Sequence, residues 1–96
     1  MRFKEQDKYE QLIQFALDGT AERIARNLSI NLFKTIQEQL FLIRSIVFTE
    51  KRQPTFEEKN AVFISSLARN HFAPGNQYGD TLSLINYWFT HLVFEE

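Results

Sequence analysis

Residues 20–49 are thirty consecutive positions without a proline or a glycine. Apolar side chains recur along this stretch at helical intervals, at Ile24, Leu28, Leu32, Ile36, Leu40, Ile43 and Val47. A straight helix of that length would measure about 45 Å, whereas a domain of 96 residues has a radius of gyration of about 12 Å. We therefore expect a break near residue 30, where Ser29 and Asn31 can compete for backbone hydrogen bonds.

Helical patterns on both sides of this stretch predict an all-α fold. Gly19 is expected to end the first helix, Thr55 and Glu58 form a candidate capping box at the start of the third, and Asp80 is expected to cap the last. The predicted architecture is a single domain, 1–96, built as a small bundle of four main helices, about 5–18, 20–49 with the break near 30, 55–72 and 80–94.

The segment LFLIRSIVF, residues 40–48, has seven apolar residues out of nine. Its length and branched side chains also fit a buried strand, which periodicity alone does not separate from a buried helix. Arg44 and Ser45 stand side by side and break any two-residue alternation. The sequence therefore favours a helix that is central in the fold or lines an interface.

Composition removes several classes of function. The chain has no cysteine, which excludes disulfides, thiolate metal sites and cysteine nucleophiles. Its 11 basic and 12 acidic residues are spread along the sequence, unlike the clustered positive charge that nucleic-acid binding favours. No apolar run approaches the roughly 20 residues that span a bilayer, and the first residues lack the apolar stretch of a secretory signal. These observations predict a cytoplasmic protein without a membrane or nucleic-acid partner.

The residues that could carry catalysis are few. The loop GNQYGDT, residues 75–81, lacks the lysine and the preceding strand of a phosphate-binding loop. His71 and His91 are the only imidazoles and fall towards opposite ends of two adjacent helices, too far apart to share an ion. The sequence therefore predicts no enzyme, no metal site and no cofactor.

Residues 22–36, ERIARNLSINLFKTI, resemble a helix-turn-helix segment. The residues that match its small and apolar packing positions are Ile24, Ala25, Leu28 and Ile30. This resemblance implies a DNA-binding transcriptional regulator. An ordinary break between two helices is the competing interpretation, since Ser29 stands where a glycine is usual.

The ten phenylalanines, three tyrosines and one tryptophan are many for a small core. Interfaces between proteins are enriched in aromatic residues and arginine. The candidate protein-binding residues lie off or beside the core stripes, or near the loop before the last helix: Phe41, Arg44, Phe48, Arg69, Asn76, Gln77, Tyr78, Tyr87 and Trp88. A core with two apolar faces would explain the same surplus, and a homodimer would bury the second face against a copy of the chain.

The sequence thus predicts a non-enzymatic helical module that binds another protein and occludes its active or docking surface. In size and composition the chain is similar to small bacterial toxin-immunity proteins, antitoxins, inhibitors and adaptors, so a toxin or an enzyme is the expected partner. A DNA-binding regulator and a structural homodimer subunit of a larger complex are the alternatives.

Overall fold

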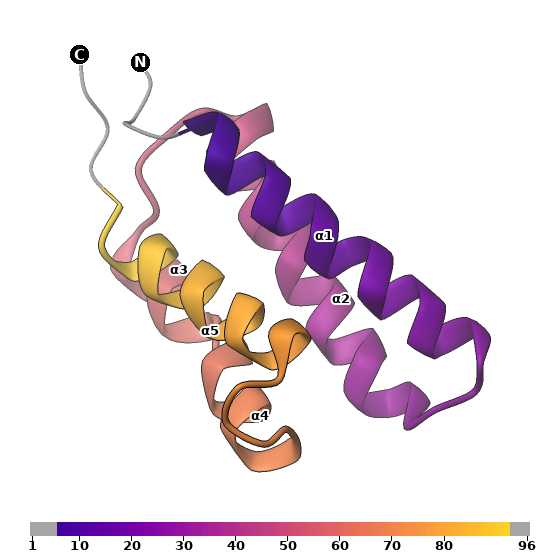
Figure 1. Ribbon diagram of the computed structural model, residues 1–96. Coiled ribbons are helices and arrows are strands. Elements are labelled where there is room, and N and C mark those ends of the chain that lie inside the picture. Colours follow the sequence, from indigo (N-terminus) through magenta and orange to yellow (C-terminus); the bar gives the residue numbers. More distant parts are fainter. Residues whose placement is uncertain (1–5, 93–96) are drawn as a thin grey trace.

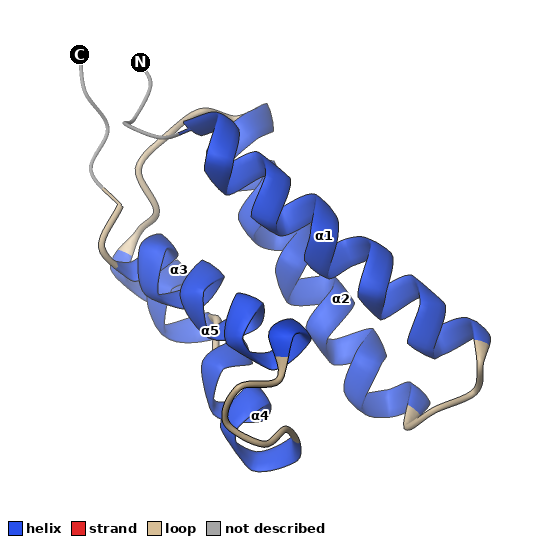
Figure 2. Ribbon diagram, in the orientation of Figure 1, coloured by secondary structure: helices blue, strands red, loops and turns tan. Residues whose placement is uncertain are grey.

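The computed structural model describes residues 6–92, and this part of the chain is helical with no strand (Figure 1, Figure 2). The prediction of an all-α fold is therefore confirmed. Four main segments make up the fold: α1, α2 with a π-helical continuation η1, the broken pair α3 and α4, and α5. Their bounds are Gln6–Ala25 for α1, Ile30–Arg44 for α2, Ser45–Thr49 for η1, Phe56–Ala61 for α3, Ile64–His71 for α4 and Gln77–Thr90 for α5.

The first helix is longer than the sequence predicted, because Gly19 does not end it. A Cβ at Gly19 would lie 3.0 Å from Cδ1 of Tyr78, so the glycine allows α5 to pack closely against α1. The expected break near residue 30 is confirmed and falls at residues 26–29. Asn27 adopts a positive φ of 58°, and the Leu28 N–H donates to the Arg23 carbonyl over 3.1 Å, as in a Schellman motif.

The predicted start of the second helix at residue 20 is wrong, because residues 20–25 continue α1 and α2 begins at Ile30. The turn at residues 26–29 joins α1 and α2 into an antiparallel hairpin (Figure 1). Near the open end of this hairpin, the ring of Tyr9 on α1 lies 6.1 Å from the ring of Phe48 on η1. Residues 40–48 are helical, as the sequence favoured, and their last turn is π-helical. The hairpin keeps the Cα radius of gyration at 13.0 Å. None of the described helices is both long enough and apolar enough to cross a membrane.

The predicted helix 55–72 is divided into α3 and α4 by extended backbone at Val62. The capping box of Thr55 and Glu58 at its start is confirmed. At the break, the Phe63 N–H donates to Oε1 of Gln39 over 2.7 Å and the Ser65 N–H donates to Oδ1 of Asn86 over 3.0 Å. Side chains of α2 and α5 therefore satisfy amides at the start of α4, where a helix leaves its first N–H groups without intrahelical partners.

The last helix begins at Gln77 rather than at residue 80, so the prediction that Asp80 is its N-cap is wrong. The N-cap is Asn76, whose Oδ1 accepts from the Gly79 N–H over 2.9 Å. A Cβ at Gly79 would lie 2.9 Å from Cβ of Phe72, which explains why a glycine stands inside the first turn. The predicted end of this helix, residue 94, lies outside the described residues.

The core is formed mainly by α1, α2 and α5, with α4 closing one end (Figure 1). The hydroxyl of the fully buried Tyr9 donates to the Ile85 carbonyl over 2.9 Å, and burial raises the pKa of this phenol. Within residues 6–92, no buried side-chain nitrogen or oxygen lacks a hydrogen-bond partner. The polar groups inside the core therefore fix the relative position of the helices.

Candidate protein-binding surface

The nine predicted binding residues do not form one patch. They fall into three groups. Phe41, Arg44 and Phe48 lie on α2 and η1; Arg69, Asn76, Gln77 and Tyr78 lie around the turn between α4 and α5; Tyr87 and Trp88 lie on the last turns of α5. Eight of them have at least part of their surface open to solvent.

Tyr78 is the exception, since the structure buries it and its predicted exposure is wrong. It stands in the first turn of α5, and its hydroxyl lies 2.5 Å from Oγ1 of Thr20 on α1. The Arg23 guanidinium carbon lies 4.0 Å from the centroid of the Tyr78 ring. Burial raises the pKa of the Tyr78 hydroxyl, and the Thr20 hydrogen bond and the Arg23 charge partly oppose that shift. Tyr78 therefore joins α5 to α1 instead of facing solvent.

Phe41, Arg44 and Phe48 form the first group, because spacings of three and four residues place them along one side of α2 and its continuation η1. The Phe41 side chain is 43% exposed, and the Arg44 guanidinium carbon lies 5.0 Å from its ring centroid. Phe48 is partly buried against the core. Three of the nine predicted residues therefore lie close together on this side of the helix.

A hollow of about 370 Å³ adjoins this group, between the first turns of α1 and the end of α2. Ile13 and Phe48 supply its apolar lining, and the remaining lining side chains are polar or charged: Gln6, Glu10, Gln14, Arg44 and Lys51. Phe41, Arg44 and Phe48 together with this hollow are called the α2 surface below. A depression of mixed polar and apolar lining, with an exposed aromatic side chain and an arginine beside it, offers the residue types that are enriched at protein-binding hot spots.

Arg69, Asn76 and Gln77 belong to the turn region between α4 and α5. Arg69 lines a hollow of about 220 Å³, and its Nη2 donates to Oγ of Ser66 over 3.4 Å. The Asn76 side chain is engaged as the N-cap of α5. The Gln77 side chain lines a different hollow, of about 370 Å³, which it shares with Phe15 of α1. These residues therefore face two depressions.

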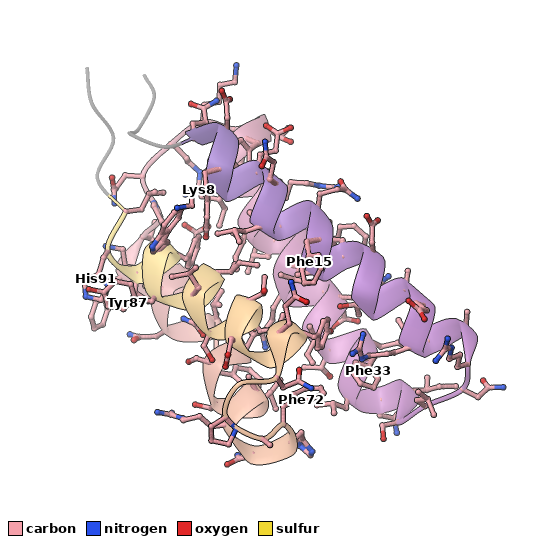
Figure 3. All side chains as sticks on the ribbon, viewed as in Figure 1. Lys8, Phe15, Phe33, Phe72, Tyr87 and His91 are labelled. Carbon is pink, nitrogen blue, oxygen red and sulfur yellow. The ribbon has the colours of Figure 1, made fainter. Side chains whose placement is uncertain are left out.

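Tyr87 and Trp88 lie on the last turns of α5. Tyr87 is 59% exposed, and its ring stacks on His91 at a centroid distance of 4.2 Å (Figure 3). Trp88 is partly buried against Tyr9, with ring centroids 5.5 Å apart, and the Lys8 ammonium lies 5.9 Å from the Trp88 ring.

Two exposed apolar residues on the same side of the fold were missed by the sequence reasoning. Phe15 is 42% exposed and Leu84 is 38% exposed. The exposure of Phe15 could have been predicted from the sequence, because Phe15 falls outside the stripe of Tyr9, Ile13 and Leu17 that α1 buries. The exposure of Leu84 could not, since it depends on where α1 lies against α5.

Residues 6–92 contain no candidate metal site. No group of three or more histidine, cysteine, aspartate or glutamate side chains is placed there to hold a metal ion. His71 and His91 are both exposed, and Nδ1 of His91 lies 2.8 Å from the Tyr87 carbonyl oxygen. His91 is therefore engaged with its own helix end.

The segment 22–36 does not have helix-turn-helix geometry. Its two helices belong to the antiparallel hairpin of α1 and α2 (Figure 1), whereas the helices of that motif cross at about 90–120°. No family model, curated protein or solved structure matches the chain.

Proposed function

We propose that this protein is a non-enzymatic helical module that binds another protein through the α2 surface. The observation that carries the proposal is the pairing of the exposed Phe41 ring with Arg44 at the edge of the hollow between α1 and α2. Aromatic residues and arginine dominate binding energy where they are desolvated at the centre of an interface. In this proposal a partner side chain enters the hollow, and the partner's surface covers Phe41.

The local charges support a selective contact. Among the described residues, Arg44 and Lys51 line the hollow with one acidic residue, Glu10. This described lining carries two positive charges and one negative charge, which favours a partner with acidic groups around an apolar anchor. Occlusion of that partner's active or docking surface would make the protein an inhibitor, an immunity protein or an antitoxin, and a passive contact would make it an adaptor.

The experiment combines site-specific crosslinking with affinity measurement. A photoreactive phenylalanine analogue replaces Phe41 in one variant and Phe56 in a second, and both are exposed to a lysate of the cells that produce the protein. Phe56 is the matched control because it is an aromatic residue on α3 with 78% exposure. We expect a stoichiometric partner to crosslink at position 41 and not at position 56.

Affinity for the purified partner is then compared across point variants. F41A and R44E should each weaken binding about 30-fold or more, as expected for hot-spot residues. F56A and K34E should leave affinity nearly unchanged, since Lys34 is an exposed cation on the same helix and does not line the hollow. A partner whose affinity is indifferent to F41A and R44E, or the recovery of no stoichiometric partner, would contradict the proposal.

A further inference from the structure

The side of the molecule formed by α1 and α5 carries an apolar surface separate from the α2 surface. The two helices are antiparallel, because Lys8 lies near Trp88 at one end and Thr20 contacts Tyr78 at the other. Phe15 and Gln77 line one hollow, and Leu84 is seven residues beyond Gln77 on the same side of α5. Leu84 therefore lies on the same side of the α1–α5 contact as Phe15.

We call this the α1–α5 face, formed by Leu12, Phe15, Leu84 and Trp88. Figure 3 shows Tyr87 beside His91 on the other flank of α5, away from Phe15 and Lys8. Phe15 and Leu84 leave 42% and 38% of their surface open, and Leu12 and Trp88 are partly buried against the core beside them. This apolar area is small compared with the roughly 800 Å² that each partner contributes to a stable interface. Polar and charged residues around it must therefore form part of the contact.

Two charged residues of α1 lie symmetrically about Phe15. Lys8 precedes it by seven residues and Glu22 follows it by seven, so all three lie on one line along the helix, with each charge about 10 Å from the centre. A second copy related by a two-fold axis at Phe15 would place each Lys8 opposite Glu22 of the other copy. A parallel pairing would instead place Lys8 against Lys8 and Glu22 against Glu22, which is unfavourable.

Glu22 already has one partner within the chain. Its Oε1 lies 2.8 Å from Nη2 of Arg26, and both side chains are largely exposed. A carboxylate accepts several hydrogen bonds, so Glu22 can keep the Arg26 pair and still receive the Lys8 ammonium of a second copy. The Lys8 side chain is exposed as well, and an interaction with the Trp88 ring at 5.9 Å does not hold it rigidly.

We infer that the α1–α5 face is a homodimer interface in which α1 packs antiparallel on α1 of a second copy around Phe15. The pairing is isologous, so each copy contributes the same residues and both ends carry the same charge pair. The α2 surface remains open in this dimer, because its hollow is lined by Gln6, Glu10 and Gln14 on the other flank of α1.

The test is a charge exchange between two variants, K8E and E22K, measured by analytical ultracentrifugation. The wild-type protein should dimerise, and each variant alone should dimerise about 10- to 100-fold more weakly, because two exposed pairs become repulsive. An equimolar mixture should recover the wild-type dimer affinity. In the mixed dimer, the carboxylate introduced at position 8 of one copy faces the ammonium introduced at position 22 of the other, and the native pair of Lys8 and Glu22 forms at the second end. The E22K substitution removes the pair with Arg26 both when this variant is measured alone and when it is in the mixture. A recovery of dimer affinity in the mixture therefore reports the contact between the two copies.

F15D and F56D provide the second comparison. F15D should abolish the dimer and F56D, on α3, should not, with far-UV circular dichroism used to confirm that both variants are folded. A wild-type protein that stays monomeric at several hundred micromolar would overturn the proposal. So would a dimer that is insensitive to K8E and E22K, or a mixture that does not recover affinity, because the two-fold register about Phe15 would then be wrong.

Discussion

Replacement of Gly19 by alanine has two opposite effects on the stability of the fold, because Gly19 lies at the contact of α1 with α5. Alanine stabilises a helix interior by roughly 1 kcal/mol relative to glycine. Its Cβ, however, would lie 3.0 Å and 3.2 Å from Cδ1 and Cε1 of Tyr78 and 3.3 Å from Nη1 of Arg23. Overpacking of this kind costs about 1–3 kcal/mol when the neighbours cannot move.

The Tyr78 ring has little room to move away. Its hydroxyl is held by Thr20 at 2.5 Å, and the rings of Phe72 and Phe33 lie edge-on at centroid distances of 5.3 Å and 6.1 Å. We therefore expect the steric cost to exceed the gain in helix propensity. G19A should lower the free energy of unfolding by up to about 2 kcal/mol, which corresponds to a fall in Tm of up to roughly 8–16 °C in a chain of this size.

The assay is urea denaturation followed by far-UV circular dichroism, arranged as a double-mutant cycle. Y78V removes both ring atoms that the new Cβ would meet, so G19A should stabilise the Y78V protein by about 1 kcal/mol. G75A is the control, since Gly75 has a φ of 87° and open space around it, and its destabilisation should be the same in both backgrounds. A stabilising G19A in the wild-type chain, or an effect independent of Tyr78, would refute the reasoning.

The remaining predictions concern two polar contacts. The Thr20 hydroxyl donates to the Ala16 carbonyl over 2.6 Å and therefore accepts from the Tyr78 hydroxyl. T20V leaves the Tyr78 phenol without an acceptor and should lower the free energy of unfolding by about 1–3 kcal/mol, whereas Y78F should lower it by about 0.5–1.5 kcal/mol. Urea denaturation measures both. Arg52, in a bidentate pair with 2.6 Å contacts, lowers the pKa of Glu58 from 4.5 to about 2, helped by the backbone N–H of the N-cap residue. Because the pKa of Glu58 is lower in the folded chain, the ion pair stabilises the fold above pH 4.5, and this stabilisation is lost as the pH falls towards 2. The difference in unfolding free energy between wild type and E58Q should therefore shrink across that range. A difference that stays constant would contradict the assignment of this pKa to the Arg52 pair.

Short-range signals predicted most of the helical content correctly. The capping box of Thr55 and Glu58 operates over three residues. The break at residues 26–29 is closed by backbone hydrogen bonds from the Asn27 and Leu28 N–H groups, and the Ser29 side chain makes no capping hydrogen bond. Residues 40–48 formed a helix because the adjacent polar pair, Arg44 and Ser45, is incompatible with strand alternation. Each of these features depends on interactions within about one helical turn, which a sequence displays directly.

The sequence named nine candidate residues without grouping them. Phe41, Arg44 and Phe48 lie along one side of α2 and η1, a proximity that follows from local helical spacing. The hollow beside them requires α1 to pack against α2, and the α1–α5 face requires Phe15 and Leu84 to come from distant helices. Their assembly depends on packing between segments that the sequence does not show to be neighbours.

The sequence by itself determined that this chain is helical, where its long apolar stretch breaks and how the helix at Thr55 begins. Only the tertiary structure decided that Gly19 continues a helix and that Tyr78 is buried. It also decided that residues 55–72 divide, through the contact of Phe63 with Gln39, 24 residues away. The physical reason is that a glycine, a tyrosine or an amide is compatible with several local conformations, and the helix packed against it selects one.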